Sequence, residues 1–247
     1  MASMKVASSL VQISLVRRCA VLEMISGENR FNIDFIKDLN SALDVVENNS
    51  EVDALITTGR GKFYSNGLDL PFVLNISREK ASEFMKDYSK LLARFVTFPV
   101  PTIAAINGHA FAAGGLLAMA HDYRLMREDR GWLCLNEVRL KLRFPPGVCD
   151  LLAAKVTQKR SLIDFLVFGK RYTGPEALRH QLVHSLHKEN DLCDNAVLLA
   201  EGLVDKEAFD RSTLRTMKMD LYKKAVKDLT RDFTFQDLEL FPPNSRF

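Results

Sequence analysis

The feature that most constrains the fold is a stretch of small and apolar residues, PTIAAINGHAFAAGGLLAMAHDYRLM, at positions 101–126. Its first part, PTIAAINGHA, is apolar enough to be a buried strand. AAGGLLAMAH is a small-residue turn that leads into an apolar helix, and DYRLMRED has the composition of another strand. A buried strand, a helix and a second strand in succession are typical of parallel pairing in α/β proteins. The stretch therefore predicts a mostly parallel sheet covered by helices.

The same alternation of strands and helices runs through most of the chain before this stretch and after it. VQISLV, AVLEMI and VDALITTG predict strands, and NIDFIKDLNSALDVVENN predicts a helix that Asn32 can cap. REKASEFMKDYSKLLARFVTF predicts a long amphipathic helix that stops before Pro99. Further helices are predicted from GVCDLLAAKV, QKRSLIDFLVFG and GPEALRHQL, and residues 192–229 are mostly helical. We therefore predict an α/β fold with a helical C-terminal extension.

Composition excludes several function classes. The 247 residues carry a formal net charge of +3 and have no extended basic block, so nothing indicates a nucleic-acid-binding protein. The four cysteines, Cys19, Cys134, Cys149 and Cys193, are scattered and form no CxxC pair, which is typical of reduced thiols in an intracellular protein. The histidines have no zinc-site spacing, and we expect no metal site.

Targeting signals are sparse. No run of 18 apolar residues is present, so we expect no membrane span. The first residues lack the apolar region and cleavage site of a signal peptide. The chain ends in Ser-Arg-Phe, a degenerate form of the peroxisomal Ser-Lys-Leu address. We therefore expect a peroxisomal location, with the cytoplasm as the alternative.

Two loops could bind a negatively charged group through the backbone. In YSNGLDL, residues 64–70, Gly67 allows a sharp turn that exposes N–H groups, and Asp69 can cap the next segment. In NGHAFAAGGLLAM, residues 107–119, small residues precede a helix, whose N-terminal N–H groups can stabilise phosphate or an oxyanion. Taken singly, each segment is better explained by structure: the first as an ordinary loop and the second as tight packing of a helix on a strand. Neither a P-loop lysine nor a GxGxxG motif is present, so nucleotide-binding folds are excluded here.

Glu137 lies in CLNEVRL, a mostly apolar segment. It could cap a helix or pair with Arg139 or Arg143, and residue type alone favours such a structural role. Burial among apolar groups would instead raise its pKa towards the range that is useful for proton transfer.

In their order along the chain, GKFYSNGLDL, the long stretch up to Met126, LCLNEVRLKLRFPPG and GPEALRHQLVH resemble the crotonase superfamily, also called the enoyl-CoA hydratase/isomerase family. The resemblance covers residues 10–190. It implies a crotonase-type spiral of ββα turns over residues 1–190 and a helical C-terminal trimerisation region over residues 191–247. It also implies an acyl-CoA thioester as substrate, and a homotrimer or dimer of trimers. CoA would be part of the substrate, and no separate cofactor is expected.

The resemblance assigns roles to particular positions. The backbone N–H groups of Leu68 and Ala113 would form an oxyanion hole for the thioester oxygen, where relatives often have glycine at the second position. Hydratases of the family have two catalytic glutamates, and here Leu116 stands at one of these positions while Glu137 stands at the other. A site with a single catalytic base resembles the site of the Δ3,Δ2-enoyl-CoA isomerases. These enzymes move a double bond in β-oxidation of unsaturated fatty acids.

Two alternatives stay open at this point. One is another acyl-CoA enzyme of the family, hydratase-like or thioesterase-like, that uses Glu137 alone or with Asp69. The other is an inactive acyl-CoA-binding protein, because Lys141 and Arg143 replace residues that are commonly apolar or glycine. If these cations approach Glu137, they would lower its pKa and weaken it as a base.

The remaining expected contacts follow from the same resemblance. Those to the substrate and its CoA phosphates involve residues near the two loops and in the C-terminal region: Arg30, Lys62, Ser65, Gly67, Asp69, Gly114, Leu116, Lys223 and Lys224. Candidates for the acyl pocket are Leu116, Leu117, Trp132 and Phe144.

Overall fold

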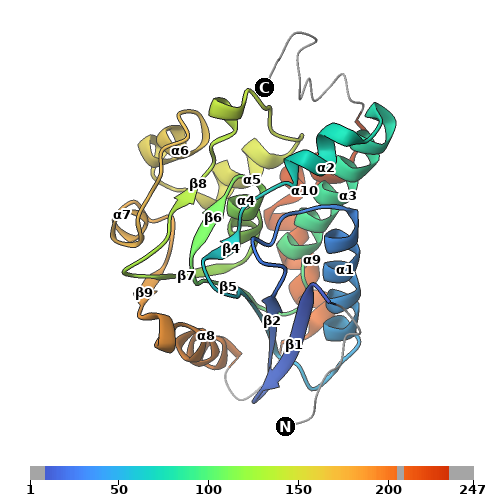
Figure 1. Ribbon diagram of the computed structural model, residues 1–247. Helices are drawn as coiled ribbons and strands as arrows, with labels where there is room; N and C mark the ends of the chain where they lie inside the picture. The colour runs from blue at the N-terminus through green and yellow to red at the C-terminus, as the bar shows by residue number, and fades with distance from the viewer. Residues whose placement is uncertain (1–8, 205–208, 234–247) are drawn as a thin grey trace.

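The computed structural model describes residues 9–204 and 209–233 (Figure 1). A six-stranded sheet crosses the molecule in the order β1-β2-β3-β5-β7-β9, and a three-stranded sheet has the order β4-β6-β8. Every pairing is parallel except β1 with β2. The predicted α/β class with mostly parallel strands is therefore confirmed. The strands are β1 (Val11–Val16), β2 (Cys19–Met24), β3 (Ala54–Gly59), β4 (Phe63–Ser65), β5 (Thr102–Ile106), β6 (His109–Phe111), β7 (Tyr123–Arg127), β8 (Leu133–Cys134) and β9 (Ser185–His187).

The chain forms a spiral in which each turn contributes one strand to each sheet. β3, β5 and β7 lie in the large sheet, and each is followed directly by a strand of the small sheet: β4, β6 and β8. Helices α2 (Leu70–Asn75) and α3 (Arg78–Val96) follow the first pair, and α4 (Ala113–Ala120) follows the second. Because the carboxyl ends of the small-sheet strands lie side by side, the loops that leave β4, β6 and β8 meet at one place.

Helices cover the large sheet on both faces because its central strands are apolar on both faces. Val21, Ile56 and Ile103 pack against α8 (Glu189–Val204). Residues of the opposite face, including Leu22 and Leu55, join the main core with α1 (Ile33–Glu47) and α3. The predicted cap of α1 is confirmed, since the Asn32 side chain accepts a hydrogen bond from the Phe35 N–H at 2.9 Å.

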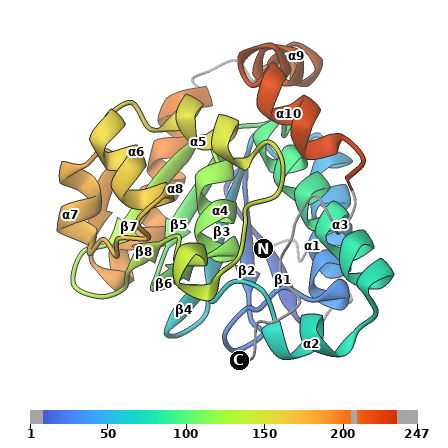
Figure 2. The ribbon, with the colours of Figure 1, turned by 90° about the horizontal axis from the view of Figure 1, so that it is seen from above.

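The other helices extend the second half of the chain. α10 (Lys223–Thr230) lies near α3 and α5 (Val148–Lys155) and contacts α9 (Arg211–Leu221), and Figure 2 shows α10 beside α3 and α5. The predicted helical C-terminal part is thus present, and the proposed boundary at residue 190 stays a prediction. Within the described ranges no helix is long and apolar enough to cross a membrane. The remaining helices are α5 (Val148–Lys155), α6 (Lys159–Leu166), α7 (Gly174–Arg179), α9 (Arg211–Leu221) and α10 (Lys223–Thr230), with a 3₁₀ turn at Glu137–Leu140.

One predicted strand is divided into two strands, β5 and β6, in the structure. PTIAAINGHA was expected to form one strand, but the chain turns at Asn107 and Gly108 and enters the small sheet as β6. Asn107 holds this turn by accepting from the Gly59 N–H at 2.9 Å and donating to the Gly61 carbonyl at 3.0 Å. A Cβ on Gly108 would lie 2.1 Å from the Lys62 carbonyl oxygen, so the close approach of the two loops requires glycine.

Candidate active site

A pocket of about 250 Å³ opens where the loops after β4, β6 and β8 meet. It is lined mainly by apolar side chains, with a few polar groups that converge on it, as is typical of small-molecule sites. Six residues expected from the sequence line it: Arg30, Leu68, Ala113, Leu116, Glu137 and Phe144. The other lining residues are Asn66, Leu70, Met85, Tyr88, Phe111, Ala112, Asn136, Leu140, Leu142, Arg143, Pro145 and Arg171.

The direction of the Leu68 backbone N–H follows from how the residue pairs with Phe31. The Phe31 N–H donates to the Gly67 carbonyl at 2.8 Å, and the Phe31 carbonyl accepts from the Asp69 N–H at 2.9 Å. In such a parallel bridge the residue between the two partners directs its own N–H to the other side. The Leu68 N–H is therefore turned away from Phe31.

Ala113 is the first residue of α4, so its N–H belongs to the helix end that has no intrahelical acceptor. The residue before it, Ala112, has φ 47° and ψ −123°, a conformation that residues with a side chain rarely adopt. This sharp turn starts α4 directly at the end of β6. Such a helix N-terminus favours negative charge.

Glycines bring these two backbone segments together. Gly67 has φ +84°, and a Cβ on it would lie 3.0 Å from the Phe111 carbonyl oxygen and 3.4 Å from the Ala113 nitrogen. A Cβ on Gly114 would lie 2.4 Å from the Ser65 carbonyl oxygen. The loop after β4 thus packs directly against the start of α4, which places Leu68 and Ala113 on facing segments.

Glu137 enters from the third loop. The Ala112 N–H donates to the Cys134 carbonyl at 2.8 Å, which joins the end of β6 to the segment that leads to the glutamate. Glu137 begins the 3₁₀ turn, is only 6% exposed, and its Oε2 is buried without a hydrogen-bond partner among the described residues. One carboxylate oxygen is therefore available to a molecule in the pocket.

Burial dominates the acidity of Glu137. Desolvation raises its pKa to about 8, opposed by a smaller effect of a hydrogen bond from its own backbone N–H. Lys141 and Arg143 are not among the groups that shift this pKa. Lys141 and Arg143 are both exposed, and Arg143 lies at the pocket wall. Of the two possibilities that the sequence left open for these cations, the structure favours the one in which they do not lower the pKa of Glu137.

Leu116 lies in the first turn of α4, 2% exposed, and its side chain forms part of the pocket wall. By the resemblance described above, it occupies the position at which hydratases of the family have one of their two catalytic glutamates. Among the lining residues of the described chain, Glu137 is the single carboxylate. The pocket therefore combines one buried acid with a largely apolar wall.

Several predicted contact residues support the site rather than line it. The Ser65 hydroxyl donates to the Asn29 carbonyl at 2.7 Å and accepts from the Gly67 N–H at 3.3 Å. Asp69 caps α2 by accepting from the Phe72 N–H at 3.3 Å. Gly67 and Gly114 allow the close packing described above. These four residues shape the backbone on which Leu68 and Ala113 lie.

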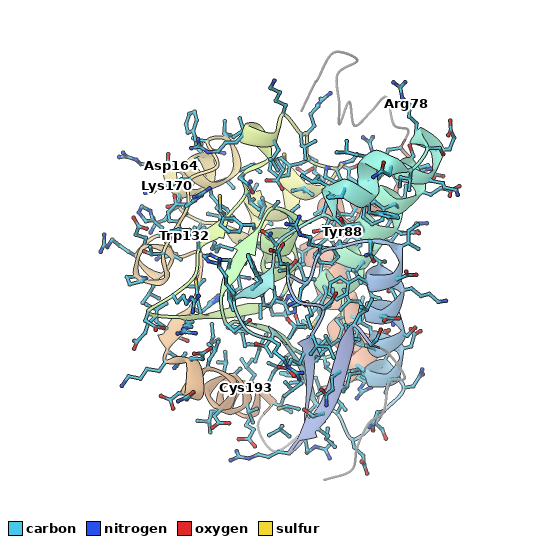
Figure 3. The ribbon with its side chains drawn as sticks, in the orientation of Figure 1. Arg78, Tyr88, Trp132, Asp164, Lys170 and Cys193 are labelled. Carbon is cyan, nitrogen blue, oxygen red and sulfur yellow. The ribbon has the colours of Figure 1, made fainter. Side chains whose placement is uncertain are left out.

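Other predicted residues lie elsewhere. Leu117 is in the core, and Trp132, labelled in Figure 3, packs beside β6 against His109 with ring centroids 5.1 Å apart. Lys62 lies over the Phe63 ring, with its Nζ 5.3 Å from the centroid. Lys223 and Lys224 begin α10, and Lys224 pairs with Asp150 at 2.7 Å. The structure does not place these five side chains in the pocket wall.

The structure adds lining residues that sequence reasoning did not select. Tyr88 and Met85 come from the middle of α3, where their helical spacing indicated only a core face. Asn136 precedes Glu137, and its Oδ1 is buried without a partner among the described residues. Arg171 comes from the loop before α7 and lies over the rings of Phe111 and Trp132. Apart from Asn136, which adjoins Glu137 in sequence, no local signal marks these residues.

Three arginines of the wall come from separate loops: Arg30, Arg143 and Arg171. Arg30 is held by Glu28, whose carboxylate accepts from the Arg30 Nε at 2.6 Å and from the Asn66 amide at 2.9 Å. These hydrogen bonds, from Asn66 and then Arg30, lower the pKa of Glu28. The pocket wall thus carries positive charge that could meet an anionic group. No cluster of metal-binding side chains occurs within residues 9–204 and 209–233.

Comparison with known proteins agrees with this geometry. A family model described as enoyl-CoA hydratase/isomerase matches residues 8–242. The chain belongs to the enoyl-CoA hydratase/isomerase family. It is 35% identical over 211 residues to enoyl-CoA delta isomerase 3 of Arabidopsis thaliana, covering 82% of this chain and 88% of that protein. It is also 35% identical to the peroxisomal enoyl-CoA delta isomerase 2 of the same plant, covering 73% and 79%.

Solved structures of this family share the fold. A family protein from Pseudomonas syringae superposes with a TM-score of 0.81 at 24% identity, covering 92% of this chain and 96% of that one. A probable enoyl-CoA hydratase from Mycobacterium tuberculosis gives a TM-score of 0.81 at 21% identity, covering 90% and 92%. The predicted crotonase fold is thereby confirmed.

Proposed function

We propose that this member of the family is a Δ3,Δ2-enoyl-CoA isomerase, which converts 3-enoyl-CoA into trans-2-enoyl-CoA. The observation that carries the proposal is that Glu137, which is buried, is the single carboxylate among the described residues of the pocket wall, where Leu116 takes the place of a second acid. Adding water uses two groups, one to activate the water and one to protonate carbon. Moving a double bond needs one group that takes a proton and returns it. The names of the Arabidopsis relatives support the same reaction.

In the proposed reaction the thioester oxygen lies between the N–H groups of Leu68 and Ala113. Ionised Glu137 takes a proton from C2, and the electron pair of that C–H bond enters a dienolate whose negative oxygen faces the two donors. The same carboxyl then gives the proton to C4, so the double bond moves to C2–C3 and the base is regenerated. Atoms and charge balance within the substrate, and the step needs no separate cofactor.

The raised pKa of Glu137 suits both halves of this cycle. A base whose conjugate acid has a pKa of about 8 is stronger than an ordinary carboxylate, and it still protonates carbon readily because the dienolate is far more basic. The apolar wall formed by Leu116 and Phe144 suits an acyl chain. Arg30, Arg143 and Arg171 are the side chains of the wall that suit the CoA phosphates.

The test is incubation of the purified protein with 3-hexenoyl-CoA while conjugated trans-2-hexenoyl-CoA is followed. The wild-type protein is expected to form it, and Glu137→Gln is expected to lose at least about 10³-fold in kcat because the transferring group is gone. Binding of a saturated acyl-CoA should persist in this variant. A wild-type protein that binds the thioester but forms no conjugated product would contradict the proposal.

The hydratase alternative is tested in the same experiment with trans-2-hexenoyl-CoA as substrate. Leu116 cannot activate water, and Asp69 is occupied as the cap of α2, so rapid hydration is not expected. Efficient hydration would show that the argument from Leu116 is wrong.

We propose a peroxisomal location, supported by the names of two Arabidopsis relatives; the Ser-Arg-Phe address expected from the sequence lies outside the described residues. Blocking that end with a C-terminal fluorescent tag should move the protein to the cytoplasm, whereas an N-terminal tag should not. We also propose a homotrimer or dimer of trimers, which sedimentation analysis would measure.

A further inference from the structure

Tyr88 is a buried phenol on α3 that the proposed reaction does not use, although it lies in the pocket wall (Figure 3). Its side chain is 1% exposed, and its hydroxyl donates to the Ala113 carbonyl with 2.6 Å between the oxygens. Burial, and then the charge of Glu137, raise the pKa of Tyr88 well above its ordinary value. The hydroxyl therefore stays protonated and donates throughout the useful pH range.

The acceptor of this bond is the residue that carries one proposed oxyanion donor. The turn before Ala113 is sharp, with Ala112 at positive φ, and no side chain of the described residues caps the start of α4. The first residue of α4 is therefore held by backbone packing and not by a side-chain cap. Tyr88 adds a side-chain hydrogen bond to this residue from a different helix.

The ring of Tyr88 contacts the other half of the site. It meets the Phe31 ring edge-on, with centroids 5.0 Å apart. Phe31 in turn holds the backbone on both sides of Leu68 through its bonds to Gly67 and Asp69. One side chain thus joins the segment that carries Leu68 to the segment that carries Ala113.

We propose that Tyr88 is a positioning residue that sets the spacing between the Leu68 and Ala113 N–H groups. The inference deepens the proposed function and rests on it. The two donors must reach one oxygen at about 2.7–3.1 Å, and small misplacements cost rate because the oxygen gains charge in the transition state. The effect of losing this link should therefore fall on kcat more than on KM.

Tyr88→Phe keeps the ring and its contact with Phe31 and removes only the hydroxyl. We expect kcat for 3-hexenoyl-CoA to fall about 10- to 100-fold, with KM changed less than about threefold and the pKa of the pH–rate profile unchanged. Tyr64→Phe is the matched control. Tyr64 is also a fully buried phenol, with its oxygen 2.8 Å from the Thr57 hydroxyl, and its loss should leave kcat near the wild-type value.

A direct readout separates positioning from a general loss of structure. The carbonyl stretching frequency of bound butanoyl-CoA, which cannot isomerise, reports how strongly the two N–H groups polarise the thioester. The wild-type protein should lower this frequency, Tyr88→Phe should lose part of the shift, and Tyr64→Phe should retain it. Phe31→Leu, which removes the ring contact, should change it in the same direction as Tyr88→Phe and serves if that variant does not fold.

Failure of the two proposals is distinguishable. If the wild-type protein does not isomerise 3-hexenoyl-CoA, the proposed function fails, and the carbonyl shift still tests Tyr88. Wild-type kcat and an undiminished shift in Tyr88→Phe would overturn the positioning role. So would the absence of any shift in the wild-type protein, or an equal loss in Tyr64→Phe.

Discussion

At the scale of single residues, the environment of Glu137 decides its chemistry. The same carboxyl on the surface would be a weak base that is ionised at every useful pH. In the apolar pocket its pKa rises to about 8, so that at pH 7 only about a tenth of it is ionised. Each ionised molecule is then a stronger base than an exposed carboxylate would be.

A pH dependence of activity follows from this pKa. We expect kcat/KM for 3-hexenoyl-CoA to rise about tenfold per pH unit below pH 8 and to level off above it, since only the ionised carboxylate takes the C2 proton. The measurement is a pH–rate profile from pH 6 to 9.5. A profile that is already level at pH 6 would mean that the carboxylate is ionised at ordinary acidity when the enzyme works.

Residue type and order were sufficient to select Glu137, Leu68, Ala113 and Leu116 as candidates for the site, through resemblance to a family. They could not select Tyr88, because its role depends on the distance from α3 to α4, which no local pattern encodes. Nor could they exclude an effect of Arg143 on Glu137. Whether the side chains of Glu137 and Arg143 approach each other depends on the backbone between them. Here it is a 3₁₀ turn that ends with Lys141 in the left-handed conformation.

At the scale of elements, the accuracy of prediction followed element length. The long helices α1 and α3 have many turns of apolar repeat and local caps at Asn32 and Ser77, so their sequences were sufficient. Strands β4, β6 and β8 have only two or three residues, too few for an alternating pattern to show. Their pairing depends on neighbouring strands that are distant in sequence, and this small sheet is what brings the three loops of the site together.

The contact between α4 and β4 can be tested by adding one methyl group. Gly114→Ala would place a Cβ 2.4 Å from the Ser65 carbonyl oxygen, and because that atom is backbone, α4 must move away. We expect the free energy of unfolding to fall by about 1–3 kcal/mol. We also expect kcat to fall at least about tenfold, because Ala113 is displaced from Leu68. Urea unfolding and the isomerase assay measure the two effects.

Gly202→Ala is the matched control for that substitution. Gly202 lies inside α8 with nothing within 4 Å of an added Cβ, so the alanine should stabilise the helix by up to about 1 kcal/mol and leave kcat unchanged. Equal effects of the two variants would contradict a steric contact specific to α4.

At the scale of the whole molecule, a buried lysine ties the C-terminal helices to the sheet. Lys218 of α9 is 7% exposed, and its ammonium donates to the Phe98 and Val100 carbonyls, each at 3.0 Å, and to the Asp122 carboxylate at 2.5 Å. Charge at this junction is compensated only while both partners are present.

Lys218→Met should therefore destabilise the protein by about 3–5 kcal/mol, since Asp122 and two carbonyls lose their donor. The double variant Lys218→Met with Asp122→Asn should recover part of that loss, because no unpaired charge remains. Both are measured by urea unfolding at pH 7. The single variant Asp122→Asn is measured as well. If the losses of the two single variants simply add up in the double variant, the two residues do not interact energetically.

The buried acid that serves catalysis should lower the stability of the whole fold. Because the folded state raises the pKa of Glu137 from 4.5 to about 8, the folded protein holds this proton more tightly than the unfolded chain. Between these pH values stability falls as pH rises, and the cost is fully present above pH 8.

Glu137→Gln removes the ionisation. It should match wild type near pH 4.5 and exceed it increasingly up to pH 8, by as much as about 5 kcal/mol. Urea unfolding across this range measures the difference, with the exposed Glu83→Gln on α3 as a control that should track wild type. A constant difference between Glu137→Gln and wild type at all pH values would mean that the carboxyl ionises equally in both states. The raised pKa, and with it the proposed strength of the base, would then have to be given up.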